Sequence, residues 1–500
     1  MPAPEIPDRD IPDRDIPDRE TDDLARLSAT DLVARYADGS LSPVEATRAC
    51  LDRIAAVDGQ LNAMTRVEAE AALAAARESE ARWRAGEPRR GPFGCCVDGV
   101  PTAIKDIVLV RGWPTRRGST TTDPDAPGPD NSPAVARLRE AGAVLTGMTA
   151  TPEFGWKGVT DSPLTGVTRN PWNPEATPGG SSGGAAAAAA TGMAALALGT
   201  DGGGSIRIPA GFTGVFGFKP SYGRIPAWPM SPFGTVSHLG PLTRTVADGA
   251  LMFQVMAQPD IRDWTAPPYG PEDYMGALDK GVADLSIAFA PTLEGHAVDP
   301  AIAALVEEAA RAFEALGARV ERADPPLQDT ARLYDVLWSV GAATLVDNLD
   351  GAARDRLDPG LAAMAAHGAT FSAVDLTRVE VERRKLGAAM TAFHERYDLL
   401  LTPTLPIAAF AAGHDVPPGG PYETWPDWTP FCYPFNLTQQ PAASVPCGLT
   451  AEGLPAGLQI VATRGADVLV LRAAAAFEAA RPWPLPPLAP LAGGEHAATA

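Results

Sequence analysis

Residues 178–190 read PGGSSGGAAAAAA, with two serines between pairs of glycines and a run of alanines behind them. By composition alone, this stretch is typical of a flexible Gly/Ser linker. The alanine run is strongly helical, however, and a linker seldom interrupts a layered pattern of strands and helices. An anion-binding helix start is another alternative, but the Lys-Ser/Thr ending of a nucleotide-binding loop is missing. We therefore expect Ser181 and Ser182 at the start of a packed helix.

A second glycine-rich stretch follows at residues 199–210, GTDGGGSIRIPA. Three glycines before Ser205 let the backbone approach a ligand closely. Several backbone N–H groups can then converge on one oxygen beside the Ser205 hydroxyl, as an oxyanion hole next to a nucleophile requires. A simple glycine turn explains the segment about equally well when it is taken alone. A dinucleotide-binding loop does not fit, because no Gly-x-Gly-x-x-Gly opens a helix after the first strand.

The third notable stretch is GVPTAIKDIVLV at residues 99–110, an apolar strand pattern that Lys105 and Asp106 interrupt. Burying a charged pair is costly unless partners or a shifted pKa compensate. A surface lysine is the ordinary alternative, but the apolar flanks favour a buried one. Because desolvation disfavours the charged form, a buried lysine loses its proton more easily and can act as a general base.

Strand and helix patterns alternate along the rest of the chain. One helix is expected to open at Ser28. A second is expected to open at Ser42, in a capping box with Pro43 and Glu45, and to end at Gly59. Four more helices are expected at 67–85, 132–142, 301–316 and 467–479. Strands are expected at 100–110, 143–145, 285–289, 319–321, 399–402 and 457–462. Strands separated by helices of this length indicate an α/β layered protein with a largely internal sheet.

No linker divides the body of the chain, so one domain is expected over residues 22–482. Residues 6–20 hold three copies of Ile-Pro-Asp-Arg-Asp, the last ending in Glu20, and their prolines and alternating charges oppose packing. Residues 1–21 are therefore predicted to be a disordered tail. Residues 483–500, rich in Pro and then in Ala and Gly, are predicted to be a flexible tail. The Pro-, Gly- and Trp-rich segment 409–429 is predicted to be a surface loop.

The composition excludes several classes of protein. The 500 residues carry 41 Lys and Arg against 61 Asp and Glu, a net charge of −20. This balance argues against a nucleic-acid or anionic-membrane partner, because both need a basic surface. No signal core and no apolar run of about 18 residues is present. Five cysteines, two of them adjacent, fit a reducing compartment, so a soluble, cytoplasmic protein is expected.

Six histidines are scattered along the chain, none of them in a glycine-rich or acidic cluster. His-x-x-x-His zinc spacing is absent, so no metal site is predicted. Each histidine is expected to be a surface or hydrogen-bonded side chain. A serine hydrolase built on this chain would therefore need a base other than histidine.

Taken together, the three stretches resemble the amidase signature family. Gly-Val-Pro before Lys105-Asp106, Gly-Gly-Ser181-Ser182-Gly-Gly and Asp201-Gly-Gly-Gly-Ser205-Ile-Arg207 stand in the order and spacing of that family. The 24 residues from Ser181 to Ser205 are also the family's separation. The resemblance covers roughly residues 24–480 and continues in motifs at 401–404, 436–438, 444–447 and 453–459.

The resemblance implies the amidase signature fold, a single large α/β/α layered domain with a mixed, mostly internal β-sheet covered by helices on both faces. It also implies a Ser–Ser–Lys triad. Ser205 would be the nucleophile and Lys105 the base. Ser181, expected to follow a cis peptide bond, would be the proton bridge between them.

Other roles follow from the same resemblance. The backbone N–H groups of Gly202, Gly203, Gly204 and Ser205 would form the oxyanion hole. Asp201, Ser182 and Arg207 would support the site. No metal or organic cofactor is expected, and a homodimer is expected only at the level of the family.

Two residues depart from the family pattern. Gly202 stands where many relatives carry a side chain, which is expected to loosen the oxyanion loop slightly. Ile208 stands where some relatives carry a polar residue and indicates an uncharged acyl group, although Ile is also ordinary core. The family commonly lines its pocket with the segments that hold Met148, Phe154, Trp156, Trp228, Phe431, Cys432, Tyr433 and Phe435. These aromatic and soft residues suit an apolar or aryl substrate, with ordinary core positions as the alternative for each.

The predicted function is hydrolysis of the amide bond of a small, neutral, apolar or aryl substrate. A carbamate (urethane), an aryl anilide or an ester are close variants. One alternative is the glutaminase-like subunit of the tRNA amidotransferase, which the net charge of −20 disfavours. A hydrolase with a nucleophile elbow at Ser182 is another, but residues 173–178 are not a strand as an elbow needs. A binding or scaffold protein without catalysis is the third.

Overall fold

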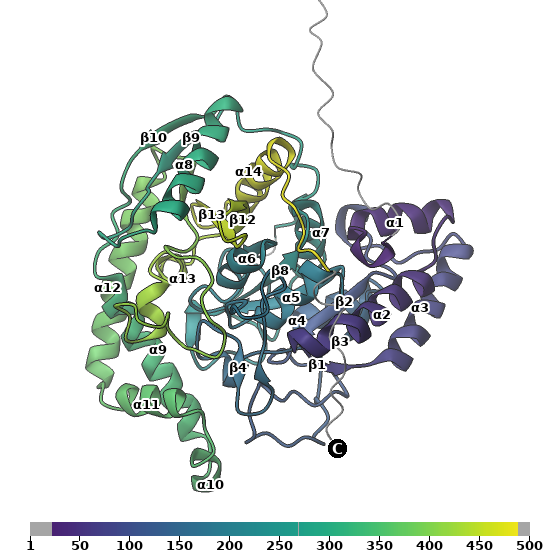
Figure 1. The fold of residues 1–500 in the computed structure, drawn as a ribbon, viewed down its shortest axis with the longest axis horizontal. Helices are drawn as coiled ribbons and strands as arrows, with labels where there is room; N and C mark the ends of the chain where they lie inside the picture. Colours follow the sequence, from purple (N-terminus) through teal and green to yellow (C-terminus); the bar gives the residue numbers. More distant parts are fainter. Residues whose placement is uncertain (1–22, 269, 489–500) are drawn as a thin grey trace, which may run out of the picture.

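The computed structural model describes residues 23–268 and 270–488, and one eleven-stranded sheet runs through this part of the chain (Figure 1). In order across the sheet, its strands are β1 (Met64–Val67), β3 (Val144–Thr149), β2 (Pro101–Lys105), β6 (Leu196–Asp201), β8 (His238–Thr243), β7 (Phe216–Lys219), β12 (Ala442–Leu449), β13 (Pro455–Ala462), β11 (Leu399–Pro403), β9 (Ser286–Phe289) and β10 (Arg319–Arg322). Two short strands, β4 (Asp161–Ser162) and β5 (Gly166–Val167), pair separately.

The large sheet is mixed, as predicted. β2 lies parallel between β3 and β6, and β9 lies parallel between β10 and β11. The pairs between these two parallel groups are antiparallel: β6 with β8, β8 with β7, β7 with β12, β12 with β13, and β13 with β11. The edge strand β1 is also antiparallel to its neighbour β3.

Helices cover both faces of the sheet. They are α1 (Ala29–Asp38), α2 (Pro43–Leu61), α3 (Ala69–Arg84), α4 (Pro133–Glu140), α5 (Gly183–Thr191), α6 (Arg207–Thr213), α7 (Val246–Met256), α8 (Pro300–Ala315), α9 (Thr330–Asp347), α10 (Gly351–Arg354), α11 (Pro359–Gly368), α12 (Ala373–Phe393), α13 (Pro434–Leu437) and α14 (Asp467–Ala480). Short 3₁₀ turns lie at Leu24–Arg26, Pro92–Gly94, Glu153–Gly155, Gly234–Val236 and Trp425–Trp428.

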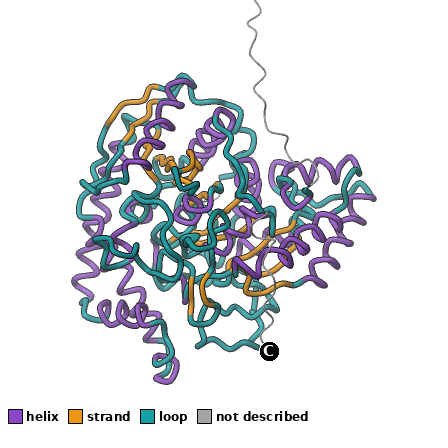
Figure 2. The backbone as a smooth tube through the Cα atoms, in the orientation of Figure 1, coloured by secondary structure: helices purple, strands orange, loops and turns teal. Residues whose placement is uncertain are grey.

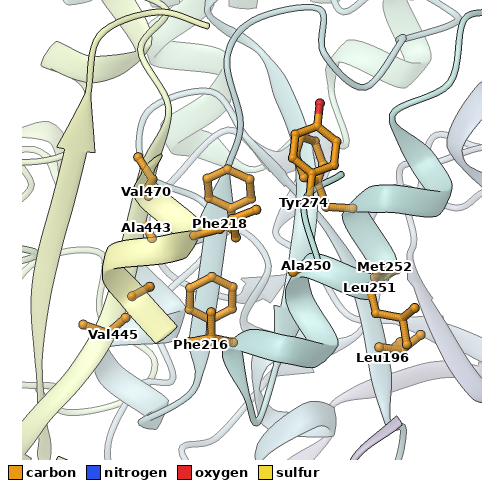
Figure 3. Close-up of a cluster of buried hydrophobic side chains, with 14 of the residues drawn as sticks. Leu196, Phe216, Phe218, Ala250, Leu251, Met252, Tyr274, Ala443, Val445 and Val470 are labelled. Carbon is orange, nitrogen blue, oxygen red and sulfur yellow. The ribbon is translucent and has the colours of Figure 1, made fainter. Parts of the chain in front are cut away.

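The side chains of successive β7 residues alternate between the two faces of the sheet, and this alternation shows how the layers form. Phe216 and Phe218 point into the hydrophobic cluster that also holds Ala250 of α7 and Val470 of α14 (Figure 3). Gly217, between them, faces α6, where an added Cβ would lie 2.6 Å from the Cβ of Ala210. Successive strand residues face opposite sides, so α6 and the α7 and α14 pair lie on opposite faces. The predicted α/β/α layering is confirmed.

Two helical groups flank the sheet at its ends. α1, α2 and α3 lie together beside β1 and β3, at the right of Figure 1. Helices α9 to α12 form the group at the left, as the helical segments in Figure 2 also show. The strands that carry the three glycine- and lysine-containing motifs lie between these groups.

Several predicted boundaries differ from the structure. The capping box at Ser42 is confirmed, but α2 continues past Gly59 to Leu61, because a helical glycine costs only about 1 kcal/mol and Asn62 provides the left-handed end at φ 52°. The strand predicted over 100–110 stops at Lys105, where the chain turns and Ile107 N–H bonds to Lys105 O. Five strands of the large sheet were not predicted: β1, β6, β7, β8 and β12.

Two predicted surface segments are also partly packed. Trp425 and Trp428 are buried, so the end of segment 409–429 belongs to the interior rather than to a surface loop. Trp483 Nε1–H donates to Arg244 O at 3.2 Å, so the packed chain extends past residue 482. The predicted tail at 1–21 and the rest of the C-terminal tail, 489–500, lie outside the described residues.

All five cysteines lie in the described part and none is paired. No group of His, Cys, Asp and Glu in this part could hold a metal ion. Among the helices described, none combines the length and the apolar character that crossing a membrane requires.

Candidate active site

Lys105 ends β2 in the interior of the protein, with its side chain fully buried. Its Nζ lies 2.6 Å from Ser181 Oγ, 2.9 Å from Ser182 Oγ and 2.8 Å from Thr200 Oγ1. No ion pair to Lys105 is present in the described structure. Burial lowers the pKa of Lys105 well below its ordinary value, and the negative charge of Asp201 only partly opposes this. Three hydroxyl groups and no carboxylate therefore surround the amine.

The two serines stand immediately before α5, so the linker alternative is wrong. The Gly180–Ser181 peptide is cis, as expected. The flanking glycines are required by close approaches between backbones: a Cβ at Gly180 would lie 2.3 Å from Val159 O, and one at Gly184 would lie 2.5 Å from Ala150 N. The tight packing of this turn brings Ser181 to the amine of Lys105.

Ser182 has a different environment from Ser181. Its Oγ–H donates to Thr200 O at 3.1 Å and its Oγ accepts from Thr200 N–H at 3.2 Å. The side chain is fully buried and lies outside the cavity that Ser181 lines. Ser182 therefore holds Lys105 and Thr200 in place, and this geometry does not fit a nucleophile.

Ser205 follows the glycine turn at the end of β6 and lines the same cavity as Ser181. Its carbonyl oxygen accepts from Ser182 N–H at 3.1 Å, which ties the two serine segments together. In the described structure, no hydrogen bond joins the Oγ atoms of Ser205 and Ser181. Hydrogen bonds of catalytic groups are often long without substrate and tighten in the complex.

The predicted oxyanion donors divide into two kinds. Gly204 N–H donates to Asp201 Oδ1 at 2.7 Å, so it is already engaged and its predicted role as a donor does not fit. The N–H groups of Gly202, Gly203 and Ser205 have no hydrogen-bond partner within the described residues. Gly202 and Ser205 also line the cavity. Three of the four predicted donors are therefore free of protein partners in the described structure, and two of these three line the cavity.

Asp201 and Arg207 form a fully buried pair that braces the glycine turn. Arg207 Nε and Nη2 each lie 2.9 Å from the carboxylate oxygens of Asp201. Burial alone would raise the pKa of Asp201, but the guanidinium of Arg207 outweighs it and holds that pKa well below its usual range. Asn436 Nδ2–H donates to Asp201 Oδ1, and Arg207 donates to Asn436 Oδ1 and to Gln459 Oε1. Asn436 and Gln459 stood in family motifs, but no role was predicted for them.

The three glycines lie against large side chains that leave no room for a Cβ. At Gly202 an added Cβ would lie 2.6 Å from Trp338 Cζ3, and at Gly203 it would lie 2.1 Å from Tyr334 Oη. Trp338 is held by a stack on Phe233, with ring centroids 3.8 Å apart. The loosening expected from Gly202 is therefore wrong, because Trp338 fills the space that a side chain there would occupy.

A cavity of about 180 Å³ opens over Ser181 and Ser205. Its wall is mostly aromatic and aliphatic: Ile107, Leu109, Phe154, Tyr222, Trp228, Met230, Phe233, Trp338 and Leu345. Two of the predicted pocket residues, Phe154 and Trp228, are in this wall.

The other predicted pocket residues are buried outside the wall: Met148, Trp156, Ile208, Phe431, Cys432, Tyr433 and Phe435. They pack behind the site. Ile208 Cδ1 lies against Gly204, 2.8 Å from where a Cβ would be, and Tyr433 stacks on Tyr334 with centroids 4.8 Å apart. The inference of an uncharged acyl group rested on Ile208, so it is no longer supported. Phe233, Trp338 and Arg117 were missed, because they come from loops and helices that no motif marks.

His238 also lines the cavity and was expected to be a surface or hydrogen-bonded histidine. It is buried, and its Nδ1 faces the carbonyl oxygens of Val236 at 2.8 Å and Asp201 at 3.2 Å. Two acceptors at Nδ1 place the proton on that nitrogen. Burial lowers its pKa well below the ordinary value, so the ring is neutral. Its Nε2 has no partner among the described residues.

Known proteins resemble this chain over nearly its whole length. The family model named Amidase matches residues 45–471. An acylamidase of Rhodococcus erythropolis is 40% identical over 465 residues, covering 91% of this chain and 96% of the relative. One subunit of the glutamyl-tRNA(Gln) amidotransferase of Symbiobacterium thermophilum is 36% identical over 485 residues, covering 90% and 96%. The crystal structure of a bacterial aryl acylamidase of the amidase signature family superposes with a TM-score of 0.84 at 33% identity, covering 91% of this chain and 96% of that one.

The layered fold and the extent of these matches define the class of protein. The chain belongs to the amidase signature family. It is an amidase, an enzyme that hydrolyses the carbon–nitrogen bond of amides.

Proposed function

We propose that this amidase hydrolyses a small amide with an apolar or aryl body through an acyl-enzyme on Ser205, with Ser181 as the proton bridge and Lys105 as the base. One observation carries the proposal: a fully buried lysine amine, with no ion pair to any described residue, bonds to a serine hydroxyl in the wall of the cavity that Ser205 also lines. The aromatic wall and the names of the two acylamidase relatives support the substrate class.

The hydrogen bonds around Lys105 suit a neutral amine. A neutral Nζ has two N–H donors and one lone pair, whereas a charged one has three donors and no acceptor. The Ser182 proton is directed to Thr200 O, so the Lys105–Ser182 bond must be donated by Lys105. A second N–H can serve Thr200 Oγ1. The lone pair is then left for the proton of Ser181, which is the direction a base needs.

The proposed reaction begins when Ser205 Oγ attacks the substrate carbonyl carbon. The Ser205 proton passes to Ser181 as the Ser181 proton passes to Lys105. Ser181 therefore relays one proton and keeps its own hydroxyl group. The protonated relay then returns a proton to the leaving amine as the carbon–nitrogen bond breaks. Water deacylates Ser205 through the same relay in a second half-reaction.

The tetrahedral intermediate places a negative charge on the former carbonyl oxygen. Gly202, Gly203 and Ser205 offer the free N–H groups that would stabilise it. Loss of one such donor costs about 3–4 kcal/mol in serine hydrolases, so this contribution is large. The buried Asp201–Arg207 pair contributes indirectly, because it fixes the turn from which these groups point.

Carbamates and esters would react by the same steps, because they present the same carbonyl carbon and differ in the leaving group. We therefore propose aryl anilides, carbamates and esters as variants to be ranked by rate. The cavity volume of about 180 Å³ suits a single aromatic or aliphatic group beside the scissile bond.

A second candidate function is supported by the similarity to the glutamyl-tRNA(Gln) amidotransferase chain. Such a protein would release ammonia from glutamine and would act with partner chains. The net charge of −20 opposes direct contact with tRNA, and the aromatic cavity wall does not suit the polar side chain of glutamine. Ammonia release from glutamine, faster than anilide hydrolysis, would favour this function over ours.

The decisive experiment measures amine or alcohol release from four substrates that share one aryl acyl or aryl group: a primary amide, an anilide, a methyl ester and an aryl carbamate. Wild type is compared with Ser205→Ala and with Ser79→Ala, which removes a buried hydroxyl that has no partner in the described structure and lies outside the cavity. We expect loss of activity in Ser205→Ala and retention in Ser79→Ala. Equal rates in Ser205→Ala and wild type would remove Ser205 from the mechanism.

A further inference from the structure

Arg117 lies in the wall of the cavity, on the loop between β2 and α4. Its backbone has a φ of 55°, in the left-handed region that side-chain-bearing residues rarely adopt. Phe154, also in the wall, has a φ of 52°, and its N–H donates to Arg117 O at 2.7 Å. Backbone strain of this kind costs about 1–3 kcal/mol and clusters at functional sites. Two strained residues, joined by a backbone hydrogen bond, thus line the same cavity.

The guanidinium of Arg117 has no hydrogen bond or ion pair with any described residue. The charge of Asp106 acts on it, but the two groups do not come within ion-pair distance. Burial lowers the pKa of Arg117, although an arginine keeps its charge at any physiological pH. The side chain is only half-buried, so water can serve its five N–H donors in the free enzyme, and a ligand that supplies acceptors can replace that water.

The other charged groups of the wall already have partners. Asp201 is paired with Arg207, and Asp263 accepts from Ala227 N–H at 2.8 Å and from Thr265 N–H at 2.9 Å. His238 is neutral because burial lowers its pKa. Within the described lining, Arg117 is therefore the one charged side chain whose charged group has neither a hydrogen bond nor an ion pair, although the Asp263 carboxylate, held by backbone N–H groups, also lacks a counter-ion.

We propose that Arg117 determines the specificity of this amidase by binding a carboxylate that the substrate carries away from its scissile bond. The inference rests on the proposed function and deepens it. The aromatic and aliphatic side chains hold the apolar body, and the planar guanidinium takes the carboxylate through two parallel N–H···O bonds. The substrate is then an amide that is apolar beside the reacting carbonyl and anionic at one end, rather than neutral throughout.

Two matched pairs of anilides test this. N-phenylsuccinamate and butyranilide differ by a carboxylate at the end of the acyl group, whereas 4-acetamidobenzoate and 4-methylacetanilide differ by one on the aryl amine. We expect wild type to have a kcat/KM at least about 10-fold higher for the carboxylate member of one pair, as for a charge-assisted hydrogen bond. The pair in which the carboxylate member is preferred shows whether Arg117 faces the acyl part or the amine part of the substrate.

The variant Arg117→Gln should abolish this preference, and Arg117→Lys should keep part of it, because the charge remains without the planar fork. Arg116→Gln is the matched control: it removes the neighbouring charge, but Arg116 is bonded to Thr122 and lies outside the wall. Thermal unfolding checks that each variant is folded. No carboxylate preference in either pair, or a preference that survives in Arg117→Gln, would overturn the proposal.

Binding without turnover separates this proposal from the proposed function. Calorimetric titration compares 4-phenylbutanoate with 4-phenylbutan-1-ol, neither of which has an amide or ester bond to hydrolyse, as probes for wild type and Arg117→Gln. Tighter binding of the carboxylate by wild type, lost in the variant, supports the role of Arg117 even if no anilide is hydrolysed. Equal binding of the two probes by wild type would contradict it even if anilide hydrolysis is found.

Discussion

The hydroxyl of Tyr334 lies directly behind Gly203, and this contact allows a test of how the proposed oxyanion loop is held. A Cβ on residue 203 would stand 2.1 Å from Tyr334 Oη, about 1.3 Å short of the 3.4 Å at which ordinary contact begins. The tyrosine cannot turn away, because its ring is stacked on Tyr433 and on Trp338, with centroids 4.8 and 5.4 Å away. We therefore expect Gly203→Ala to displace the loop rather than the ring.

The expected size of the effect follows from this displacement. Overpacking of a tight core lowers the free energy of unfolding by about 1–3 kcal/mol. A shift of about 1 Å in groups that position the reaction lowers kcat about 100-fold. In the double variant with Tyr334→Phe, the nearest atom becomes Cζ at 2.7 Å, so part of both losses should return. Tyr334→Phe alone should cost little, because the hydroxyl has no hydrogen-bond partner in the described structure.

The assay measures kcat on an anilide that wild type hydrolyses, and the free energy of unfolding in urea. Gly59→Ala is the control, because Gly59 is exposed in α2 with no atom near its added Cβ, and this change should stabilise the protein by up to about 1 kcal/mol. Wild-type kcat and stability in Gly203→Ala would refute the reasoning. So would a double variant that is no better than Gly203→Ala.

Three further predictions concern groups around the same loop. Because burial lowers the pKa of Lys105, kcat/KM should rise with pH through that lowered pKa as the amine becomes neutral, and a flat profile across the acidic and neutral range would contradict a lysine base. Arg207→Leu leaves Asp201 buried without its counter-ion and should lower the free energy of unfolding in urea by about 3–5 kcal/mol; a loss under about 1 kcal/mol would show that the pair does not brace the loop. Trp338→Ala should lower stability by about 3–5 kcal/mol and raise KM for anilides, and an unchanged KM would remove Trp338 from the substrate wall.

Much of the fold was predictable, because it depends on local signals. The capping box of Ser42 and Glu45 is confirmed at the start of α2, and the polyalanine run at 185–190 is helical in α5. Short apolar runs marked β9, β10 and β11 within one or two residues of their ends. Caps and side-chain periodicity act over a few residues, so the sequence contains them directly.

Predictions failed where a distant contact decides the structure. β2 ends at Lys105 although the apolar pattern continues, because Asp106 N–H bonds to Thr149 O of the neighbouring strand and the chain then turns. Trp428 is buried in a segment whose composition suggests a surface loop, because it stacks on Phe212 with centroids 5.9 Å apart. Neither partner is near in sequence.

The sequence by itself determined the motifs of the site and their family, because Lys105, Ser181 and Ser205 stand in a distinctive order and spacing. Only the tertiary structure decided which donors of the glycine turn are free and which residues line the cavity. Gly204 is engaged by Asp201, and the wall includes Arg117 and Trp338, which approach from separate elements. The physical reason is that a reaction needs particular side chains at particular spacings, and these can be recognised in the sequence. A cavity is the space left open where segments distant in sequence pack together, so it cannot be recognised there.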